Sequence, residues 1–224
     1  MNIIVTGAGR GIGLEVCKCF LQNPDNTIYA ISRNIDALKT LQVRFPNLFP
    51  LSFDLESNSF DEVANHINNK IDILINNAGL LINKAFGDFE QTDLERTMNV
   101  NFIAPFKLIQ TLLPYFAESA HIVNISSMGG FQGSSKFSGL SAYSASKAAL
   151  ACLSECLAEE LKPRNIKINC LCLGAVQTEM LEMAFPNYKA DMQPADISKF
   201  IVDFALQAYK YMNGKVIPVS LNTP

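Results

Sequence analysis

Apolar segments of strand length recur along this chain and are separated by segments with the periodicity of α-helices. The apolar segments cover residues 2–6, 27–32, 48–55, 71–77, 121–126, 166–173 and 215–220. Strands that alternate with helices form a parallel sheet covered by helices on both faces. Several of these segments are apolar at almost every position, as expected for strands buried on both faces. The sequence therefore predicts a doubly wound α/β fold of about seven strands.

The chain has 224 residues, 49% of them hydrophobic, without a linker, low-complexity tract or repeat of fixed period. We therefore expect one domain that spans residues 1–224. The formal net charge is -3 and the Lys and Arg residues are scattered, so neither nucleic acid nor an anionic membrane is an expected partner. No apolar run reaches the roughly 18 to 20 residues of a membrane span. Because the first apolar segment begins at Asn2, which leaves no room for a secretory leader, we expect a cytoplasmic protein.

The six cysteines fall in three close pairs that do not form a metal-binding pattern. The pairs are Cys17 with Cys19, Cys152 with Cys156, and Cys170 with Cys172. His66 and His121 lie far from these pairs in the sequence, and the chain has no CxxC motif. We expect buried free thiols and no metal site, with a redox role as the alternative.

The motif TGAGRGIG, residues 6–13, follows the first apolar segment and precedes a helical one. Glycines let the backbone turn tightly and approach a pyrophosphate, and free N–H groups at the start of the next helix attract the anion. This placement predicts a dinucleotide site on a Rossmann-type fold, and the alternative is a turn that only saves space. The residues expected at the site are Gly7, Gly9, Arg10, Gly11, Ile12 and Gly13.

The end of the second apolar segment indicates which dinucleotide is bound. An acidic residue about 20 positions after the glycine turn would favour the ribose hydroxyls of NAD, whereas a basic residue would pair with the additional phosphate of NADP. The sequence there is AISRN, so Arg33 and Arg10 predict NADP(H), unless both are solvated surface residues. Asp54, with Leu55 beside it, could bind the adenine, or Asp54 could cap a helix that begins near Ser57.

The segment SAYSASKAAL, residues 141–150, carries Tyr143 and Lys147 four positions apart. On a helix these side chains are stacked neighbours. A phenol has an ordinary pKa of about 10, and a nearby ammonium lowers it, which would make Tyr143 a usable general acid or base at neutral pH. The alternative is a partly buried tyrosine beside a lysine whose charged end reaches solvent.

Five segments in a fixed order resemble the motifs of the short-chain dehydrogenase/reductase family. They are TGAGRGIG (6–13), NNAG (76–79), VNFIAPF (100–106), IVNISS (122–127) and YSASK (143–147). The resemblance implies a catalytic tetrad of Asn101, Ser127, Tyr143 and Lys147. In that assignment Ser127 and Tyr143 stabilise the oxygen of a carbonyl substrate, Lys147 binds the nicotinamide ribose, and Asn101 holds a water in a proton relay.

The resemblance places further cofactor contacts at Asn77, Ala78, Gly79, Val176 and Thr178. Three assignments have alternatives. Thr178 could cap a helix, and Asn101 could satisfy backbone groups of a helix or loop. Ser126 could replace Ser127, because successive strand side chains point to opposite faces.

Two departures from the family pattern lie near the expected pocket. The loop between Ser127 and Tyr143 is longer than is usual, and Leu173 stands where the family usually has proline. The least regular segments, 128–140 and 179–193, follow strands, so we expect them to form a substrate pocket at the carboxyl edge of the sheet. Its apolar lining is expected from Phe131, Phe137, Met180, Met183 and Phe185.

The sequence thus predicts an NADPH-dependent reductase of ketones or aldehydes, with a 3-oxoacyl thioester among the candidate substrates. The alternative function is a regulatory protein that binds NADPH without turnover. A sugar-nucleotide epimerase is disfavoured by the short chain and the spacing of the glycines. Segments 90–117 and 141–162 have long apolar helical faces, which in relatives often pair between subunits, so we expect a homodimer or homotetramer.

Overall fold

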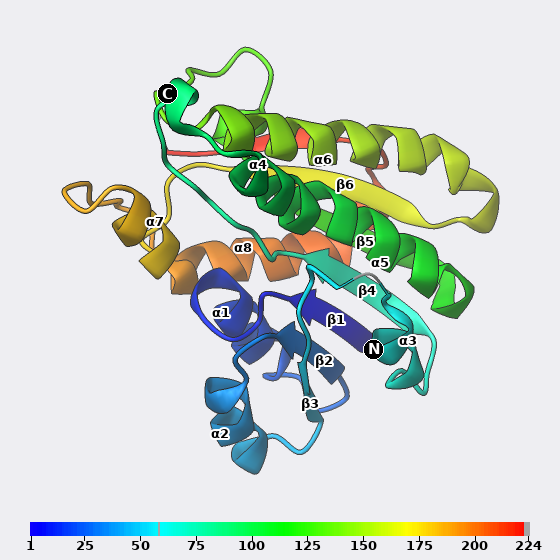
Figure 1. The fold of residues 1–224 in the computed structure, drawn as a ribbon. Helices are drawn as coiled ribbons and strands as arrows, with labels where there is room; N and C mark the ends of the chain where they lie inside the picture. The colour runs from blue at the N-terminus through cyan, green and yellow to red at the C-terminus, as the bar shows by residue number, and fades with distance from the viewer. Residues whose placement is uncertain (58, 222–224) are drawn as a thin grey trace.

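The computed structural model describes residues 1–57 and 59–221, and these residues form one seven-stranded parallel sheet (Figure 1). Residues 58 and 222–224 of the expected domain lie outside the described residues. The strand order is β3-β2-β1-β4-β5-β6-β7, which confirms the predicted doubly wound α/β fold. The strands are β1 (Asn2–Thr6), β2 (Thr27–Ser32), β3 (Leu48–Ser52), β4 (Ile71–Asn76), β5 (Phe116–Ser127), β6 (Lys167–Leu173) and β7 (Val216–Val219).

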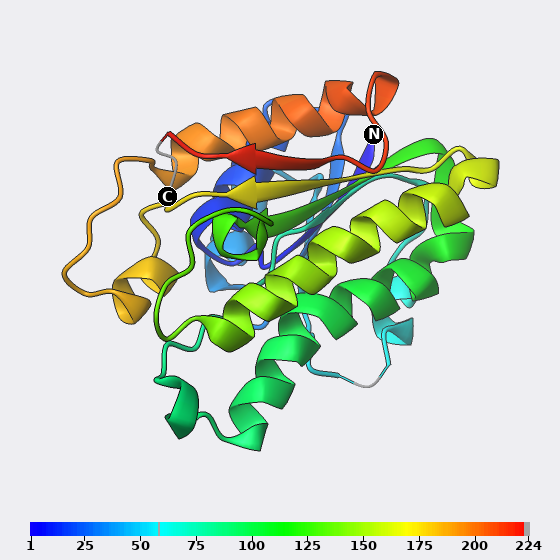
Figure 2. The same cartoon turned by 90° about the horizontal axis from the view of Figure 1, so that it is seen from above.

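Helices cover both faces of the sheet, and Figure 2 shows α8 on one side with α5 and α6 on the other. The helices are α1 (Gly11–Phe20), α2 (Asp36–Arg44), α3 (Asp61–Asn65), α4 (Gln91–Met98), α5 (Ala104–Leu112), α6 (Ser141–Glu160), α7 (Glu179–Ala184) and α8 (Pro194–Gln207). On its face of the sheet, α8 packs against α1. Helix α6 packs on the opposite face, over β5 and β6.

Strand β1 shows why an almost continuous apolar segment is needed at the centre of the sheet. Ile3 and Val5 pack into a cluster with α1 and α8, whereas Ile4 packs with α3 and α5 on the other face. All three side chains are fully buried. Burial of a side chain of this size stabilises the fold by about 1.5–3 kcal/mol.

Strand β5 is longer than its apolar segment indicates. It begins at Phe116, whereas the sequence predicted a start at His121. The additional residues include the exposed Glu118 and Ser119, and Ser119 has a positive φ of 67°. Pairing with β4 shifts register over the same stretch. Because polar residues interrupt this end of the strand, a search for continuous apolar residues does not detect it. Strand β3 ends at Ser52, three residues earlier than predicted.

The helical segment predicted over residues 90–117 is divided in the structure. Helix α4 ends at Met98, a π-helical turn covers Asn99–Ile103, and α5 follows. Pro105 has no N–H, so it cannot donate to the carbonyl of Asn101, its partner in a regular α-helix. The wider turn at this point is a common way to accommodate such a break, and it often occurs at functional sites.

Candidate active site

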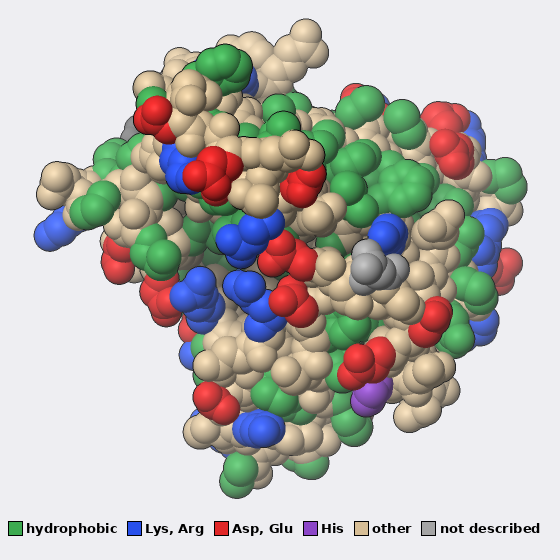
Figure 3. All heavy atoms as spheres, in the orientation of Figure 1, with side chains coloured by type: hydrophobic (Ala, Val, Ile, Leu, Met, Phe, Trp, Pro, Cys, Tyr) green, Lys and Arg blue, Asp and Glu red, His purple; other side chains and the backbone are tan. Residues whose placement is uncertain are grey.

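A cavity of about 730 Å³ lies at the carboxyl ends of the strands. Its wall includes residues that follow or end β1, β2, β4, β5 and β6, which is where ligands bind in open parallel sheets. The volume is typical of a small-molecule site. Figure 3 shows Lys and Arg side chains next to Asp and Glu side chains around a hollow of the surface. The two irregular segments, 128–140 and 179–193, both contribute to the wall, as the sequence predicted.

The glycine turn leaves the first N–H groups of α1 open toward this cavity. Gly7 and Gly11 have positive φ values of 65° and 53°, a region that glycine adopts without strain. Arg10 is the N-cap residue of α1, and its side chain does not cap the helix. The helix start therefore keeps N–H donors and the positive end of its dipole for an anion.

Gly9 and Gly13 are not among the described residues that line the cavity, and their role in binding a cofactor stays a prediction. A Cβ at Gly13 would lie 2.3 Å from the carbonyl oxygen of Gly7, and a Cβ at Gly9 would lie 2.3 Å from that of Asn34. These two glycines allow the turn to pack against its neighbours. Gly7, Gly11 and Ile12 supply cavity wall.

The segment after β4 is tied to the end of β1. The Thr6 hydroxyl accepts hydrogen bonds from the N–H groups of Asn77 and Ala78, both at 3.1 Å. The Asn77 amide donates to the carbonyl of Thr6 at 3.0 Å. Asn77, Ala78 and Gly79 all line the cavity, so these bonds fix one wall of it. We call residues 6–13 and 77–79 the cofactor floor.

Arginines gather at the end of the cavity next to β2. Arg33 lines the wall with Arg10, and within residues 1–57 and 59–221 it has no ion-pair partner. Arg10 forms an ion pair with Glu179 at the start of α7. Arg96 of α4, which the sequence did not single out, pairs with Glu56 at 3.1 Å and also lines the cavity.

Asp54 and Leu55 line the same end of the cavity. Asp54 accepts a hydrogen bond from the N–H of Glu56 at 3.0 Å and so forms a local turn. The suggestion that it caps a helix near Ser57 is wrong, because α3 begins only at Asp61. The carboxylate therefore stays on the wall, exposed and available to a ligand.

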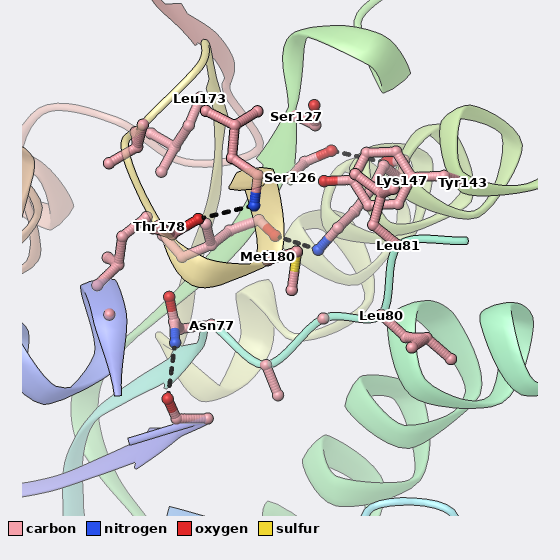
Figure 4. A pocket seen from close by; sticks show the side chains of 18 of the residues that line it. Asn77, Leu80, Leu81, Ser126, Ser127, Tyr143, Lys147, Leu173, Thr178 and Met180 are labelled. Atoms are coloured by element: carbon pink, nitrogen blue, oxygen red, sulfur yellow. Dashed lines mark hydrogen bonds between the residues drawn. The ribbon is translucent and has the colours of Figure 1, made fainter. Parts of the chain in front are cut away.

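Ser127 and Tyr143 meet at the opposite end of the cavity (Figure 4). Burial raises the pKa of the Tyr143 phenol above its ordinary value, and a hydrogen bond with Ser127 partly opposes that rise. The predicted lowering of this pKa by Lys147 does not occur in the structure, because burial dominates and Lys147 is not among the groups that offset it. A raised pKa keeps the phenol protonated at neutral pH.

Lys147 lines the cavity with Tyr143 and is buried. Its Nζ donates to the carbonyl of Ile125 at 2.9 Å, and its side chain is only 3% exposed. Burial lowers the pKa of this ammonium to about 8. The alternative in which the charged end reaches solvent is therefore wrong.

The two serines at the end of β5 have distinct surroundings. Ser126 is buried and donates to the backbone carbonyl of Lys147 at 2.8 Å, which ties α6 to the sheet. Ser127 accepts from the N–H of Gly129 at 3.1 Å and interacts with Tyr143. The geometry therefore favours Ser127 over Ser126 as the hydroxyl beside a reacting group.

Asn101 lies outside the cavity wall and is completely buried. Its side chain accepts from the N–H of Leu80 at 2.7 Å and donates to the carbonyl of Leu80 at 2.8 Å. It also donates to the Ser146 hydroxyl at 2.9 Å, which in turn donates to the carbonyl of Tyr143 at 2.7 Å. The alternative raised from the sequence is thus present: the Asn101 side chain satisfies the backbone groups of Leu80, next to the cofactor floor, and links that segment to the helix that carries Tyr143.

Thr178 is the N-cap of α7, since its hydroxyl accepts from the N–H of Leu181 at 3.3 Å, yet it also lines the cavity. Val176 lies on the wall as predicted and pairs with Met192 in an isolated parallel bridge. Leu173 ends β6 and is paired with strands on both sides, so the residue at the usual proline position continues the sheet to the cavity. We call residues 175–193 the α7 segment, and Figures 1 and 2 show it projecting from the carboxyl edge.

The wall of the cavity is largely apolar. It includes Leu81, Met128, Phe137, Leu140, Met180, Leu181, Phe185, Tyr188 and Met192. Of the apolar residues named from the sequence, Phe131 lines a neighbouring cavity and Met183 is 77% exposed, so neither belongs to this wall.

The cysteines and histidines do not line the cavity, although Cys170 and Cys172 lie close to Lys147. All six cysteines are free, and Cys152 and Cys156 are exposed on α6, which corrects the expectation that every thiol is buried. The parts of the chain that the structure describes hold no group of three or more His, Cys, Asp or Glu side chains placed to bind a metal ion. None of the helices in those parts has the length and apolar character needed to cross a membrane.

A model of the family described as short chain dehydrogenase matches residues 1–189. This chain belongs to the short-chain dehydrogenase/reductase family. It is therefore an oxidoreductase that uses a nicotinamide dinucleotide to interconvert carbonyl and alcohol groups. The five motifs noted in the sequence all contribute residues to the wall of this one cavity.

Curated relatives of this short-chain dehydrogenase act on different substrates. The 3-oxoacyl-[acyl-carrier-protein] reductase FabG of Chlamydia pneumoniae is 29% identical, and the match covers 97% of this chain and 94% of that protein. The L-xylulose reductase of Caenorhabditis elegans is 33% identical over 80% of this chain and 73% of that protein.

Solved structures confirm the fold of this dehydrogenase and differ in the cofactor they contain. A 4-hydroxyisoleucine dehydrogenase mutant complexed with NADH and succinate superposes with a TM-score of 0.86 at 26% identity, covering 98% of this chain and 97% of that one. ElxO with NADP bound superposes with a TM-score of 0.85 at 26% identity, covering 98% and 96%. The choice between NADH and NADPH therefore depends on this chain's own residues.

Sequence reasoning missed several residues of this dehydrogenase that the fold brings to the site. Arg96 and Glu179 belong to helices whose orientation no local motif indicates. Thr6 and Ser146 belong to the motifs already quoted, but the hydrogen bonds that give them a role are to residues 71 and 45 positions away.

Proposed function

We propose that this protein is an NADPH-dependent reductase that converts an apolar ketone or aldehyde to an alcohol. The observation that carries the proposal is the placement of Ser127, Tyr143 and Lys147 at one end of a cavity whose other end contains the glycine turn and Arg33. An acid and a hydrogen-bond donor are thus aimed at the same space. The cofactor would span the distance between the two ends.

The cavity fits a dinucleotide in shape and charge. A Cβ at Gly11 would lie 3.6 Å from Thr178, so a side chain there would project into the space between the turn and the α7 segment. The N–H groups at the start of α1 would bind the pyrophosphate, and Asn77, Ala78 and Gly79 would support the nicotinamide half. Arg33, with Arg10, supports NADPH rather than NADH, because a guanidinium pairs well with a phosphate.

In the proposed reaction the cofactor supplies the hydride and the protein supplies the proton. When bound, the nicotinamide supplies the hydride for the carbonyl carbon. Tyr143, kept protonated by burial, donates its proton to the carbonyl oxygen. Ser127 donates a hydrogen bond to the same oxygen as negative charge develops on it. Lys147 would hold the ribose, and Asn101 would support the proton relay by fixing the turn in which it lies.

The proposed substrate is uncharged near its carbonyl. The cavity wall contains many Leu, Met and Phe side chains, and its arginines lie at the glycine turn, after β2 and on α4. An anionic group next to the carbonyl would lose much of its hydration there, and Lys147, the cation beside Tyr143, is assigned to the cofactor ribose. A 3-oxoacyl thioester would fit if its charged carrier remained outside.

We also propose a homodimer or homotetramer. The outer surface of the helical layer keeps Leu94 of α4 and Phe106 of α5 substantially exposed, at 49% and 41%. Helix α6 presents the small exposed residues Ala145 and Ala148, which would let a second helix approach closely. Analytical ultracentrifugation tests this, and a monomer at micromolar concentration would contradict it.

The decisive experiment measures NADPH oxidation by wild-type protein and Tyr143→Phe over a panel of apolar ketones, an acetoacetyl thioester and an anionic keto acid. We expect Tyr143→Phe to lower kcat by about 100- to 10,000-fold while the Kd for NADPH stays unchanged. Arg33→Asp should shift preference toward NADH, with Arg44→Asp on the outer side of α2 as the charge-matched control. NADPH binding with no turnover of any substrate would instead support the regulatory alternative.

A further inference from the structure

The ion pair between Arg10 and Glu179 connects two parts of the cavity that are far apart in sequence. Arg10 belongs to the cofactor floor, and Glu179 is the first residue of α7. Both side chains line the cavity, and each is 60% exposed. The guanidinium proposed to bind a cofactor phosphate is therefore already engaged with a carboxylate of this chain.

The three arginines of the cavity differ in this respect. Arg96 is held by Glu56, whereas Arg33 has no carboxylate within ion-pair distance in the part of the chain that the structure describes. A phosphate that enters this end meets Arg33 directly but has to displace Glu179 to use Arg10 fully. If Glu179 stays, its negative charge also lies close to the phosphate and repels it.

We propose that Glu179 is a specificity-determining residue that restrains binding of the 2′-phosphate of NADPH through its ion pair with Arg10. The inference rests on the proposed use of NADPH. An exposed ion pair contributes little to stability, whereas a phosphate monoester carries a charge of about −1.5 to −2 at neutral pH. The phosphate therefore displaces Glu179 from Arg10, but breaking that ion pair lowers the affinity of the protein for the phosphate.

The exchange also couples cofactor binding to the α7 segment. Once Arg10 turns to the phosphate, the start of α7 loses its contact with the cofactor floor. The end of α7 keeps another contact, because the Asn83 amide donates to the carbonyl of Ala184 at 2.9 Å. The phosphate thus loosens the first turn of α7, and by reciprocity any ligand that moves that turn away from Arg10 strengthens phosphate binding.

The test compares Kd values for NADPH and NADH in wild-type protein, Glu179→Gln, Arg10→Met and the double variant. Glu182→Gln is the matched control, because it removes a charge from the same helix and keeps an oxygen for its partner Gln177. We expect Glu179→Gln to tighten NADPH binding about two- to fivefold with NADH unchanged. Glu182→Gln should change neither Kd, and Glu179→Gln should have no effect on the Arg10→Met background.

Hydrogen exchange supplies a second readout that does not depend on turnover. Adding 2′,5′-ADP should speed amide exchange at the start of α7 relative to 5′-AMP in the wild type, and this difference should vanish in Glu179→Gln. A wild type that prefers NADPH with a ratio unaltered by Glu179→Gln would overturn this inference alone. A wild type that binds both dinucleotides equally would overturn the proposed cofactor preference and the inference with it.

Discussion

The cofactor floor and the α7 segment face each other across the cavity and are held in place by different kinds of contact. In the floor, the buried Thr6 hydroxyl binds two backbone N–H groups, and glycines allow the backbone segments to touch. In the α7 segment, the Gln177 side chain binds the N–H of Ala190 and the Glu182 carboxylate, at or near the surface. Buried contacts fix one geometry, whereas exposed contacts are easily exchanged. We infer that the floor positions the cofactor and that the α7 segment adapts to the ligand.

The largest expected effect comes from filling the space between the floor's backbone segments. Gly13→Ala places a methyl group 2.3 Å from the carbonyl oxygen of Gly7 and 2.6 Å from the Asn77 amide. We expect a loss of about 2–3 kcal/mol in the free energy of unfolding, together with weakened cofactor binding. Denaturant titration and NADPH binding measure both. Gly87→Ala is the control, because among the described residues no atom beyond its two chain neighbours lies within 4 Å of the place its methyl group would take, and an equal loss there would contradict the argument.

The same substitution in each region provides a direct comparison. Thr6→Val removes a hydroxyl that accepts from two partly buried backbone N–H groups, of which, among the described residues, only that of Asn77 has a second acceptor, the Ile75 carbonyl, and the loss should cost about 2 kcal/mol of unfolding free energy. Thr178→Val removes only the N-cap bond to Leu181, which should cost about 1 kcal/mol and act within α7. Thermal unfolding and site-resolved hydrogen exchange would test this order. Equal losses of unfolding free energy in both variants would contradict the difference between the regions.

The pH dependence of turnover tests whether the charge of the buried Lys147 is needed. Its pKa is lowered to about 8 by burial, so the ammonium is present below that pH and is lost as the pH rises through it. If the charge is needed for turnover, kcat/KM for reduction should fall about tenfold per pH unit above pH 8. NADPH binding measured over the same pH range separates loss of chemistry from loss of cofactor. A flat profile to pH 10 would show that the charge is dispensable.

The smallest expected effect is in the α7 segment. Gln177→Ala removes the bonds to Ala190 and Glu182, and because the side chain is only partly buried we expect less than about 1 kcal/mol of lost stability. The KM for substrate should rise a few-fold while the Kd for NADPH stays the same. An unchanged KM with weakened NADPH binding would assign the α7 segment to the cofactor instead.

The regions also differ in how far the sequence predicted them. The glycine turn and the Tyr143 to Lys147 spacing are local patterns, because their geometry follows from a few adjacent residues. The role of Asn101 was ambiguous, since its side chain binds the backbone of Leu80, which is 21 positions away. The pKa of Tyr143 was predicted in the wrong direction, because the charge of a neighbour is visible in a sequence and the degree of burial is not.

By itself, the sequence predicted the order of strands and helices, the family, and many of the residues that line the cavity at the carboxyl edge, because apolar periodicity, glycine placement and short motifs are properties of adjacent residues. The tertiary structure alone decided which serine faces Tyr143, how deeply Lys147 is buried, and that Arg10 is paired with Glu179. These features depend on side chains from distant segments whose approach is set by packing. Burial and ion pairing therefore became known only with the fold.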